Sequence, residues 1–205
     1  YYWTALFGAV VFTYLLVHLL SNKLPLVQKH RVVAWVIIFV VLCGGVSLLH
    51  PNFYLDRFLE VLITNHDDFI RISDDDGIIH FYHLRSSWTS VVINAPWALL
   101  SGMLRPFLWE TNGAMSMLAS AENLVIMVLL LSALTRITHI KQHQLILLSV
   151  CVYIALLCIF LALSTPNLGT LSRYRVGFLP FLIFIVTYRN PLLSFLMNRI
   201  KILRS

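Results

Sequence analysis

Five stretches of this chain are continuously apolar, and most approach the 20 or so residues with which an α-helix crosses a hydrocarbon core of about 30 Å. They cover residues 1–20, 32–49, about 117–134, 145–163, and a last run that begins near 176 and ends near 188 or continues toward 197. The last run is short, and Pro180 and Pro191 interrupt it. The strands of a β-barrel would instead alternate polar and apolar residues over about ten positions. The pattern therefore predicts an all-α, polytopic membrane helical bundle of about five spans.

A further apolar stretch, residues 87–109, is broken by Asn94, Pro96, Gly102 and Pro106. These interruptions exclude a clean span and favour either a helix that lies in the membrane interface or a re-entrant pair. Interrupted backbone at membrane depth survives only against protein or a water-filled cavity. Such a segment is therefore a reasonable wall for a site.

The remaining pattern divides the chain into three parts. Residues 1–50 would form two transmembrane helices, residues 51–116 an outward-facing loop with interfacial helices, and residues 117–205 three transmembrane helices and a basic tail. Within the loop, 56–62 has the pattern of a short amphipathic helix. The Asp-Asp-Asp-Gly sequence at 74–77 is a turn signal, and 78–84 is compatible with a short strand or an interfacial helix.

Composition supports the membrane assignment. Of 205 residues, 59% are hydrophobic and only 12% charged, whereas a soluble domain is about half apolar and a quarter charged. An ordinary soluble enzyme and a disordered chain are both excluded. The chain begins Tyr1-Tyr2-Trp3, without Met and inside an apolar run, so we expect a piece of a longer protein or a missing start.

The distribution of charge predicts the orientation of the spans. The net charge is +6, but the connections at 21–31 and 136–143 and the tail from 189 carry cations and no acid. Residues 51–116 carry eight of the nine acids and four Arg. Cytoplasmic loops are enriched in Lys and Arg, so the N-terminus and the long loop are expected to face outward and the C-terminus the cytoplasm. No basic patch is interleaved with exposed aromatics, so nucleic acid is not an expected partner.

Arg173, Tyr174 and Arg175 are the first candidates for a binding site. The two Arg lie at the outward mouth of the last two spans, against the positive-inside trend, and a charge placed there needs a reason. The guanidinium fork suits phosphate, and the turn at 167–170 could add backbone donors. The alternative is pairing with lipid headgroups or with the acids of the long loop.

Three more residues are candidates. Arg105 could join the anion site, and Glu110, five residues further, could act as a base or bind sugar hydroxyls. The alternative for both is an interfacial aromatic belt with a local ion pair. Glu122 lies inside the third span, where an acid is costly unless partnered. A catalytic role and a structural ion pair with Arg105, Arg173 or Arg175 are equally compatible with that position.

The sequence indicates neither a metal site nor a cofactor. His80 and His83 have the spacing of two ligands on one helical face, but the surrounding residues match no known ligand pattern, so solvated loop residues are the better interpretation. Cys43, Cys151 and Cys158 lie within spans, where they fit apolar packing positions. No nucleotide-binding loop, dinucleotide fingerprint or serine-nucleophile elbow is present.

Three of these segments, 105–110, 121–123 and 167–175, occur in an order that resembles the C-terminal half of bacterial O-antigen polymerases and ligases. They are more distantly similar to C-type glycosyltransferases, which use polyprenyl-linked sugars. The resemblance covers about residues 95–181. Family members usually have about twice as many spans, and the first outer loop in which C-type enzymes carry a catalytic Asp is not identifiable here.

The resemblance implies a multi-pass protein of the bacterial inner (plasma) membrane, acting in cell-envelope polysaccharide biosynthesis as a polymerase-like glycosyltransferase. Its donor would be an oligosaccharide on a polyprenyl diphosphate, and no metal would be required. Arg173, Tyr174 and Arg175, with Arg105, would bind the diphosphate, and Glu110 and Glu122 are the catalytic candidates. Two alternatives stay open. One is a flippase-like transporter, and the other is a non-catalytic subunit that joins other membrane subunits in an envelope complex.

Overall fold

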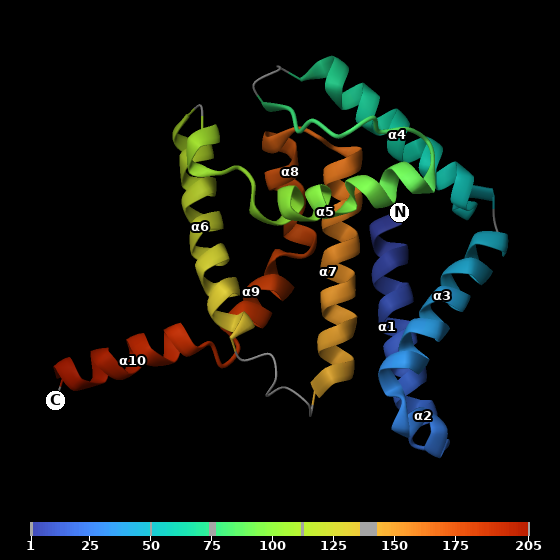
Figure 1. The fold of residues 1–205 in the computed structure, drawn as a ribbon, viewed down its shortest axis with the longest axis horizontal. Helices are drawn as coiled ribbons and strands as arrows, with labels where there is room; N and C mark the ends of the chain where they lie inside the picture. The colour runs from blue at the N-terminus through green and yellow to red at the C-terminus, as the bar shows by residue number, and fades with distance from the viewer. Residues whose placement is uncertain (1, 50, 74–76, 112, 136–142, 205) are drawn as a thin grey trace.

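The computed structural model describes residues 2–49, 51–73, 77–111, 113–135 and 143–204, which are mostly helical (Figure 1). Four helices are long and apolar enough to cross a membrane, namely α1 (Tyr2–Ser21), α3 (Arg31–Leu49), α6 (Ala114–Leu134) and α7 (Gln144–Ser164). Each begins and ends within three residues of a predicted run. The predicted all-α polytopic bundle is confirmed, and its apolar helices are compatible with an integral membrane protein.

The fifth predicted span is a broken helix. It consists of α8 (Leu168–Tyr174), the 3-10 turn η6 (Arg175–Gly177) and α9 (Leu179–Thr187), and its two halves are bent by 70°. Pro180 lies in the first turn of α9, where its missing N–H breaks no helical hydrogen bond. The pair counts as a fifth span only if both halves are taken together.

The alternative in which the last span continues toward residue 197 is wrong, because the chain turns after α9. Arg189 has a positive φ of 50°, and the buried Asn190 follows it. The Asn190 amide donates to the carbonyls of Leu129 and Val186, and its Oδ1 accepts from the backbone N–H of Leu192. These bonds start a separate helix, α10 (Pro191–Arg204), which runs sideways from the bundle (Figure 1).

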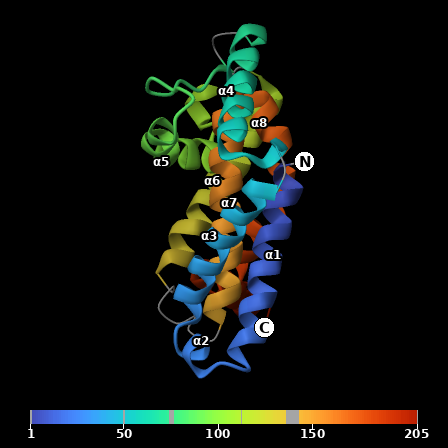
Figure 2. The ribbon, with the colours of Figure 1, turned by 90° about the vertical axis from the view of Figure 1, so that its right-hand side faces the viewer.

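Two helices cap one end of the spans. The predicted amphipathic helix at 56–62 is longer than expected and forms α4 (Leu55–Ile72), which follows the 3-10 turn η1 (Pro51–Phe53). Its buried residues Leu59, Leu62 and His66 recur at helical spacing, so the same face continues past the predicted end. The segment 87–109 forms one helix, α5 (Trp88–Leu104), and the turn η3 (Leu108–Glu110), not a pair of helices. Its position in the membrane interface stays a prediction. Helix α5 lies across the spans, and α4 runs obliquely over the same end of the bundle (Figures 1 and 2).

The segment 78–84 forms neither the strand nor the helix that its pattern allowed. Ile78 makes an isolated bridge with Asn167. The buried Asn94 of α5 accepts a hydrogen bond from the N–H of Tyr82 and donates to the Tyr82 carbonyl. A side chain therefore satisfies backbone groups that a strand partner would otherwise occupy.

The long loop and the basic segments that the structure describes lie at opposite ends of the bundle, as the charge pattern predicts. The cap of α4 and α5 lies at one end, with the start of α1 (Figure 1). The short helix α2 (Pro25–Lys29), the C-terminal end of α6 and the start of α10 lie at the other. The basic connection at 136–142 lies outside the described residues. Which end faces the cytoplasm stays a prediction.

Helix α7 is the centre of the bundle, and it packs against α1, α3, α4, α5, α8 and α9. Its residues Leu157, Cys158 and Leu161 are almost completely buried. Helix α5 crosses it closely, because a Cβ added to Gly102 would lie only 2.6 Å from the carbonyl oxygen of Cys158. This contact sets how near the cap lies to the spans.

We therefore expect Gly102→Ala to lower the free energy of unfolding by about 1–3 kcal/mol, the usual effect of overpacking. The matched control is Gly44→Ala in α3, where an added Cβ has no neighbour within 4 Å. Thermal unfolding of both variants in detergent measures the difference. Equal melting temperatures would show that α5 and α7 are not held at this distance.

Candidate functional site

Arg175 is buried, and each of its three guanidinium nitrogens donates a hydrogen bond to the protein. Its Nε donates to the carbonyl of Gly102 at 3.1 Å, and one Nη donates to Oδ1 of Asn123 at 2.6 Å. The other Nη donates to the carbonyl of Arg105. Arg175 therefore ties the bend of the broken span to the end of α5 and to α6.

Arg105 and Glu110 form a two-pronged ion pair beside this tie. The Arg105 Nε and Nη2 lie 3.0 and 2.7 Å from the two carboxylate oxygens of Glu110, and the side chains are 12% and 18% exposed. Glu110 also accepts the N–H of Phe107, and the Arg105 guanidinium lies 5.6 Å from the ring centre of Trp97. The alternative of a local ion pair beside aromatics is thus the arrangement observed, and three donors already hold the Glu110 carboxylate.

Asn123 connects these two features. Its side chain is buried, accepts from Arg175 and donates to the carbonyl of Pro106 at 3.0 Å. Sequence reasoning singled out its neighbour Glu122 and missed Asn123. The available signal was a polar amide inside an apolar span, which needs a partner wherever it is buried.

Arg173 and Tyr174 lie apart from Arg175. Arg173 is exposed and makes no hydrogen bond or ion pair with a residue that the structure describes. Tyr174 packs edge-on against Trp3, with ring centres 5.2 Å apart. The two Arg are separated because residues at i and i+2 of a helical turn do not share a face.

The remaining candidates are not brought into this cluster. The amide of Asn167 caps α8 by accepting the N–H of Thr170, so this backbone donor is occupied. Glu122 is exposed on α6, and His80 and His83 are exposed on the loop before α5. Among the described residues no group of three ligating side chains is placed to hold a metal, and Asp74–Asp76 lie outside them.

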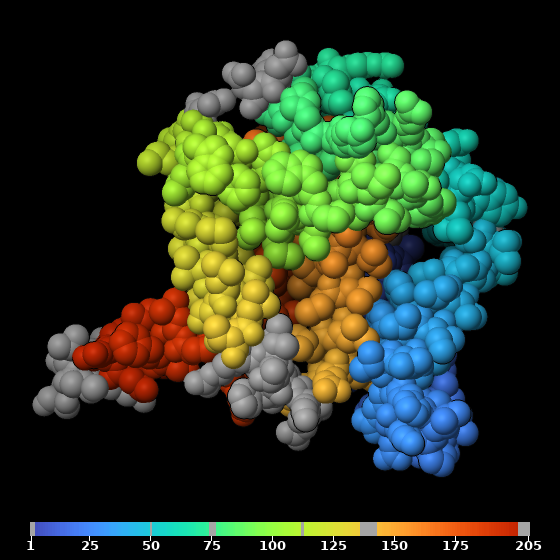
Figure 3. Space-filling model, in the orientation of Figure 1, coloured from blue at the N-terminus to red at the C-terminus, as the bar shows by residue number. Residues whose placement is uncertain are grey.

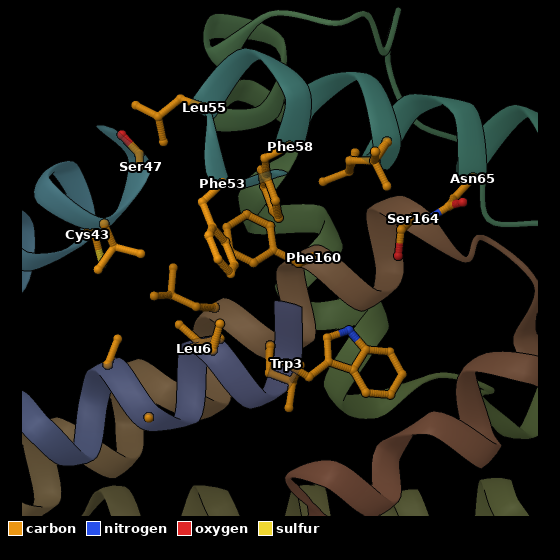
Figure 4. Close-up of a pocket in the computed structure, with 18 of the residues that line it drawn as sticks. Trp3, Leu6, Cys43, Ser47, Phe53, Leu55, Phe58, Asn65, Phe160 and Ser164 are labelled. Atoms are coloured by element: carbon orange, nitrogen blue, oxygen red, sulfur yellow. The ribbon is translucent and has the colours of Figure 1, made fainter. Parts of the chain in front are cut away.

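The structure adds a cavity that no sequence pattern indicated. It has a volume of about 1100 Å³ and lies between α1, α3, α4 and α7 (Figures 3 and 4). Apolar side chains form most of its wall, among them Leu6, Phe12, Phe39, Phe58 and Phe160. No pattern could reveal it, because its wall combines four helices that are distant in sequence.

Helix α4 forms one wall of this cavity, and polar residues of α4 and of the end of α7 line it. Asn65 of α4 and Ser164 lie toward the same end (Figure 4), and Thr165 and Tyr174 also line the wall. Asn65 is exposed and makes no hydrogen bond with a described residue. The cavity therefore combines a mostly apolar wall with a few polar groups, of which Asn65 and Ser164 lie at one end and Ser47 at the other (Figure 4).

His66 fastens α4 to the spans beside this polar end. Its Nδ1 lies 2.8 Å from the carbonyl oxygen of Leu163, in the last turn of α7, and its ring packs near Phe81. Carbonyls of a last helical turn have no intrahelical partner, so a neutral imidazole that donates here satisfies one of them. Burial lowers the pKa of His66, against smaller opposing effects of this hydrogen bond and of Asp67.

Comparison with protein-family models, with curated proteins and with solved structures gives no match, so the interpretation of the site depends on its geometry.

The buried hydrogen bonds of Arg175 predict that its substitution lowers the free energy of unfolding much more than substitution of the nearby Arg173. Arg175→Met leaves three buried acceptors unpaired and should lower the free energy of unfolding by about 2–4 kcal/mol. Arg173→Met, at an exposed position, should change it by no more than about 0.5 kcal/mol. Thermal unfolding without added ligand tests both, and equal losses would contradict the assignment of Arg175 as the tie.

The lowered pKa of His66 predicts a pH dependence. The folded state disfavours the protonated ring, so the unfolded chain binds more protons, and stability should fall as the pH drops below about 6.5, the ordinary His pKa. One proton limits the slope to about 1.4 kcal/mol per pH unit. His66→Gln keeps a donor without titrating, so melting temperatures between pH 7.5 and 5.5 should depend less on pH in this variant. An unchanged slope would mean that other groups cause the dependence.

Proposed function

We propose that this chain is an integral membrane protein of envelope glycan assembly that binds a polyprenyl-diphosphate-linked oligosaccharide at the outer face of the inner membrane. The observation that carries the proposal is the apolar cavity beneath α4. Its volume of about 1100 Å³ slightly exceeds the usual 300–1,000 Å³ of ligand pockets, and a long hydrocarbon chain suits such a wall.

The polar end of the cavity supports an amphiphilic ligand rather than a simple hydrocarbon. Asn65, Ser164 and Thr165 offer hydrogen-bonding groups there, at the cap end of the bundle. A lipid whose chain fills the apolar body would place its first polar group among them. The diphosphate and the sugar would then extend into the cap, outside the apolar layer of the spans.

Arg173 is the best candidate for binding the diphosphate. Arg173 is exposed and has no hydrogen-bond or ion-pair partner among the described residues, and its neighbour Tyr174 lines the cavity. Arg105 and Arg175 have their donors engaged by Glu110 and by backbone and amide oxygens, so they act as positioning residues in this proposal. If transfer occurs, Arg173 would stabilise the charge that develops on the leaving diphosphate.

The flippase-like alternative has one observation in its favour, the 70° bend of the broken span next to Arg173. Broken helices recur at transporter binding sites. A glycosyltransferase forms a new glycosidic bond, whereas a flippase moves its lipid across the membrane without forming one. Product analysis of proteoliposomes given the lipid-linked oligosaccharide distinguishes the two.

Two substitutions test the binding site. Gly8 lines the cavity and has no neighbour within 4 Å of an added Cβ, so Gly8→Phe should fill the cavity without a local clash. We expect it to weaken binding of a polyprenyl-diphosphate sugar at least tenfold, as measured by native mass spectrometry of the purified protein. Gly44→Phe is the matched control, since Gly44 also has open space but does not line the cavity.

Arg173→Gln should weaken the same lipid about tenfold, because a charge-assisted hydrogen bond contributes roughly 1.5–3 kcal/mol, and should leave binding of the uncharged polyprenol unchanged. Wild-type affinity in both Gly8→Phe and Arg173→Gln would refute the proposed site.

A further inference from the structure

Glu122 is an acid on the outer surface of a membrane-spanning helix. It is the ninth residue of α6 and is exposed, and its carboxyl group makes no hydrogen bond or salt bridge with a described residue. It lies close enough to Arg175 to act on it electrostatically. However, the Arg175 donors are directed to three other oxygens, and Arg105 is held by Glu110.

The depth of Glu122 makes this exposure costly. Helix α6 has 21 residues, which at 1.5 Å each gives about 31 Å, close to the thickness of the hydrocarbon core. If α6 crosses the hydrocarbon core over its whole length, Glu122 lies about 12 Å from its N-terminal end, which is far from the headgroups for so short a side chain. Acids at such depth are rare and normally face protein or a water-filled cavity, and α6 lines none of the cavity beneath α4.

The surface around Glu122 has the spacing of a helix-packing seam. Met115, Leu118, Glu122 and Val125 alternate at three and four residues, and all four are exposed. This is the pattern of positions that meet a partner helix, and a polar residue at one of them selects the partner. The seam continues into Leu129 and Ser132, and there Asn190 occupies it through hydrogen bonds with both residues.

Asn190, just before α10, therefore occupies the half of this seam at Leu129 and Ser132. The other half, Met115 to Val125, is open. In Figure 1, α6 stands at the edge of the bundle, on the side away from α1 and α3. We infer that the open half, Met115 to Val125, binds a membrane-spanning helix from outside this sequence that carries an Arg or Lys at the depth of Glu122. Lipid chains offer no donor, whereas a basic side chain supplies the opposite charge and hydrogen-bond donors that this carboxyl group lacks.

Energy transfer to model helices tests the inference without knowing the partner. The labelled full chain is reconstituted in phosphatidylcholine vesicles with labelled 21-residue helices of Leu and Ala that carry either one Arg at the ninth position or Ala there. We expect the wild-type chain to bind the Arg helix about tenfold more tightly, the order of a single interhelical polar contact. Glu122→Gln should abolish this preference and leave the melting temperature unchanged.

A shifted pair provides the control for position. The double variant Glu122→Gln/Leu118→Glu moves the acid one turn along the same seam and should prefer a helix with Arg at the fifth position over one with Arg at the ninth. The absence of any Arg preference in the wild type, or its persistence in Glu122→Gln, would overturn the inference. So would association of wild-type copies without added helix that is lost in Glu122→Gln, because the partner would then be a second copy of this chain.

Discussion

The buried guanidinium of Arg175 holds the capped end of this bundle together, because its three nitrogens donate to the end of α5, to the amide of Asn123 on α6 and to the backbone of Arg105. Carbonyls at helix ends have no partner inside their helix and are costly to bury unpaired. A planar fork can satisfy several such acceptors at once, which an ammonium group cannot do in the same geometry. The bend of the fifth span, the last turn of α5 and α6 are therefore positioned by one side chain.

The positions of the other candidate residues follow from this tie. The backbone carbonyl of Arg105 accepts a hydrogen bond from Arg175, while the Arg105 side chain contacts Glu110 and Trp97. Because Arg175 turns inward, Arg173, two residues earlier, is left outside. A motif that resembled two equivalent anion-binding Arg is in fact one structural Arg and one accessible Arg.

The cap depends on a second set of contacts, made by α4. Its apolar face packs against α7, and His66 satisfies a carbonyl at the end of α7. The side chains between these contacts do not fill the space below, and the cavity lies there. Protein interiors are normally close-packed, so an apolar space of this size is the feature on which the proposed function depends.

The local sequence pattern was sufficient to predict the four long apolar helices, because an apolar run of sufficient length needs no tertiary contact to define it. It failed where the outcome depended on a side chain from elsewhere. Asn94 binds the backbone of the 78–84 segment at Tyr82, and Asn190 lies between α9 and α10 and binds the backbone N–H of Leu192. The sequence by itself determined the fold class, four spans to within a few residues, and the separation of acidic and basic segments between the two ends. Only the tertiary structure decided which polar groups pair with one another, which Arg stays accessible and where the cavity forms. These depend on distances between helices far apart in the chain, on which hydrophobic periodicity carries no information.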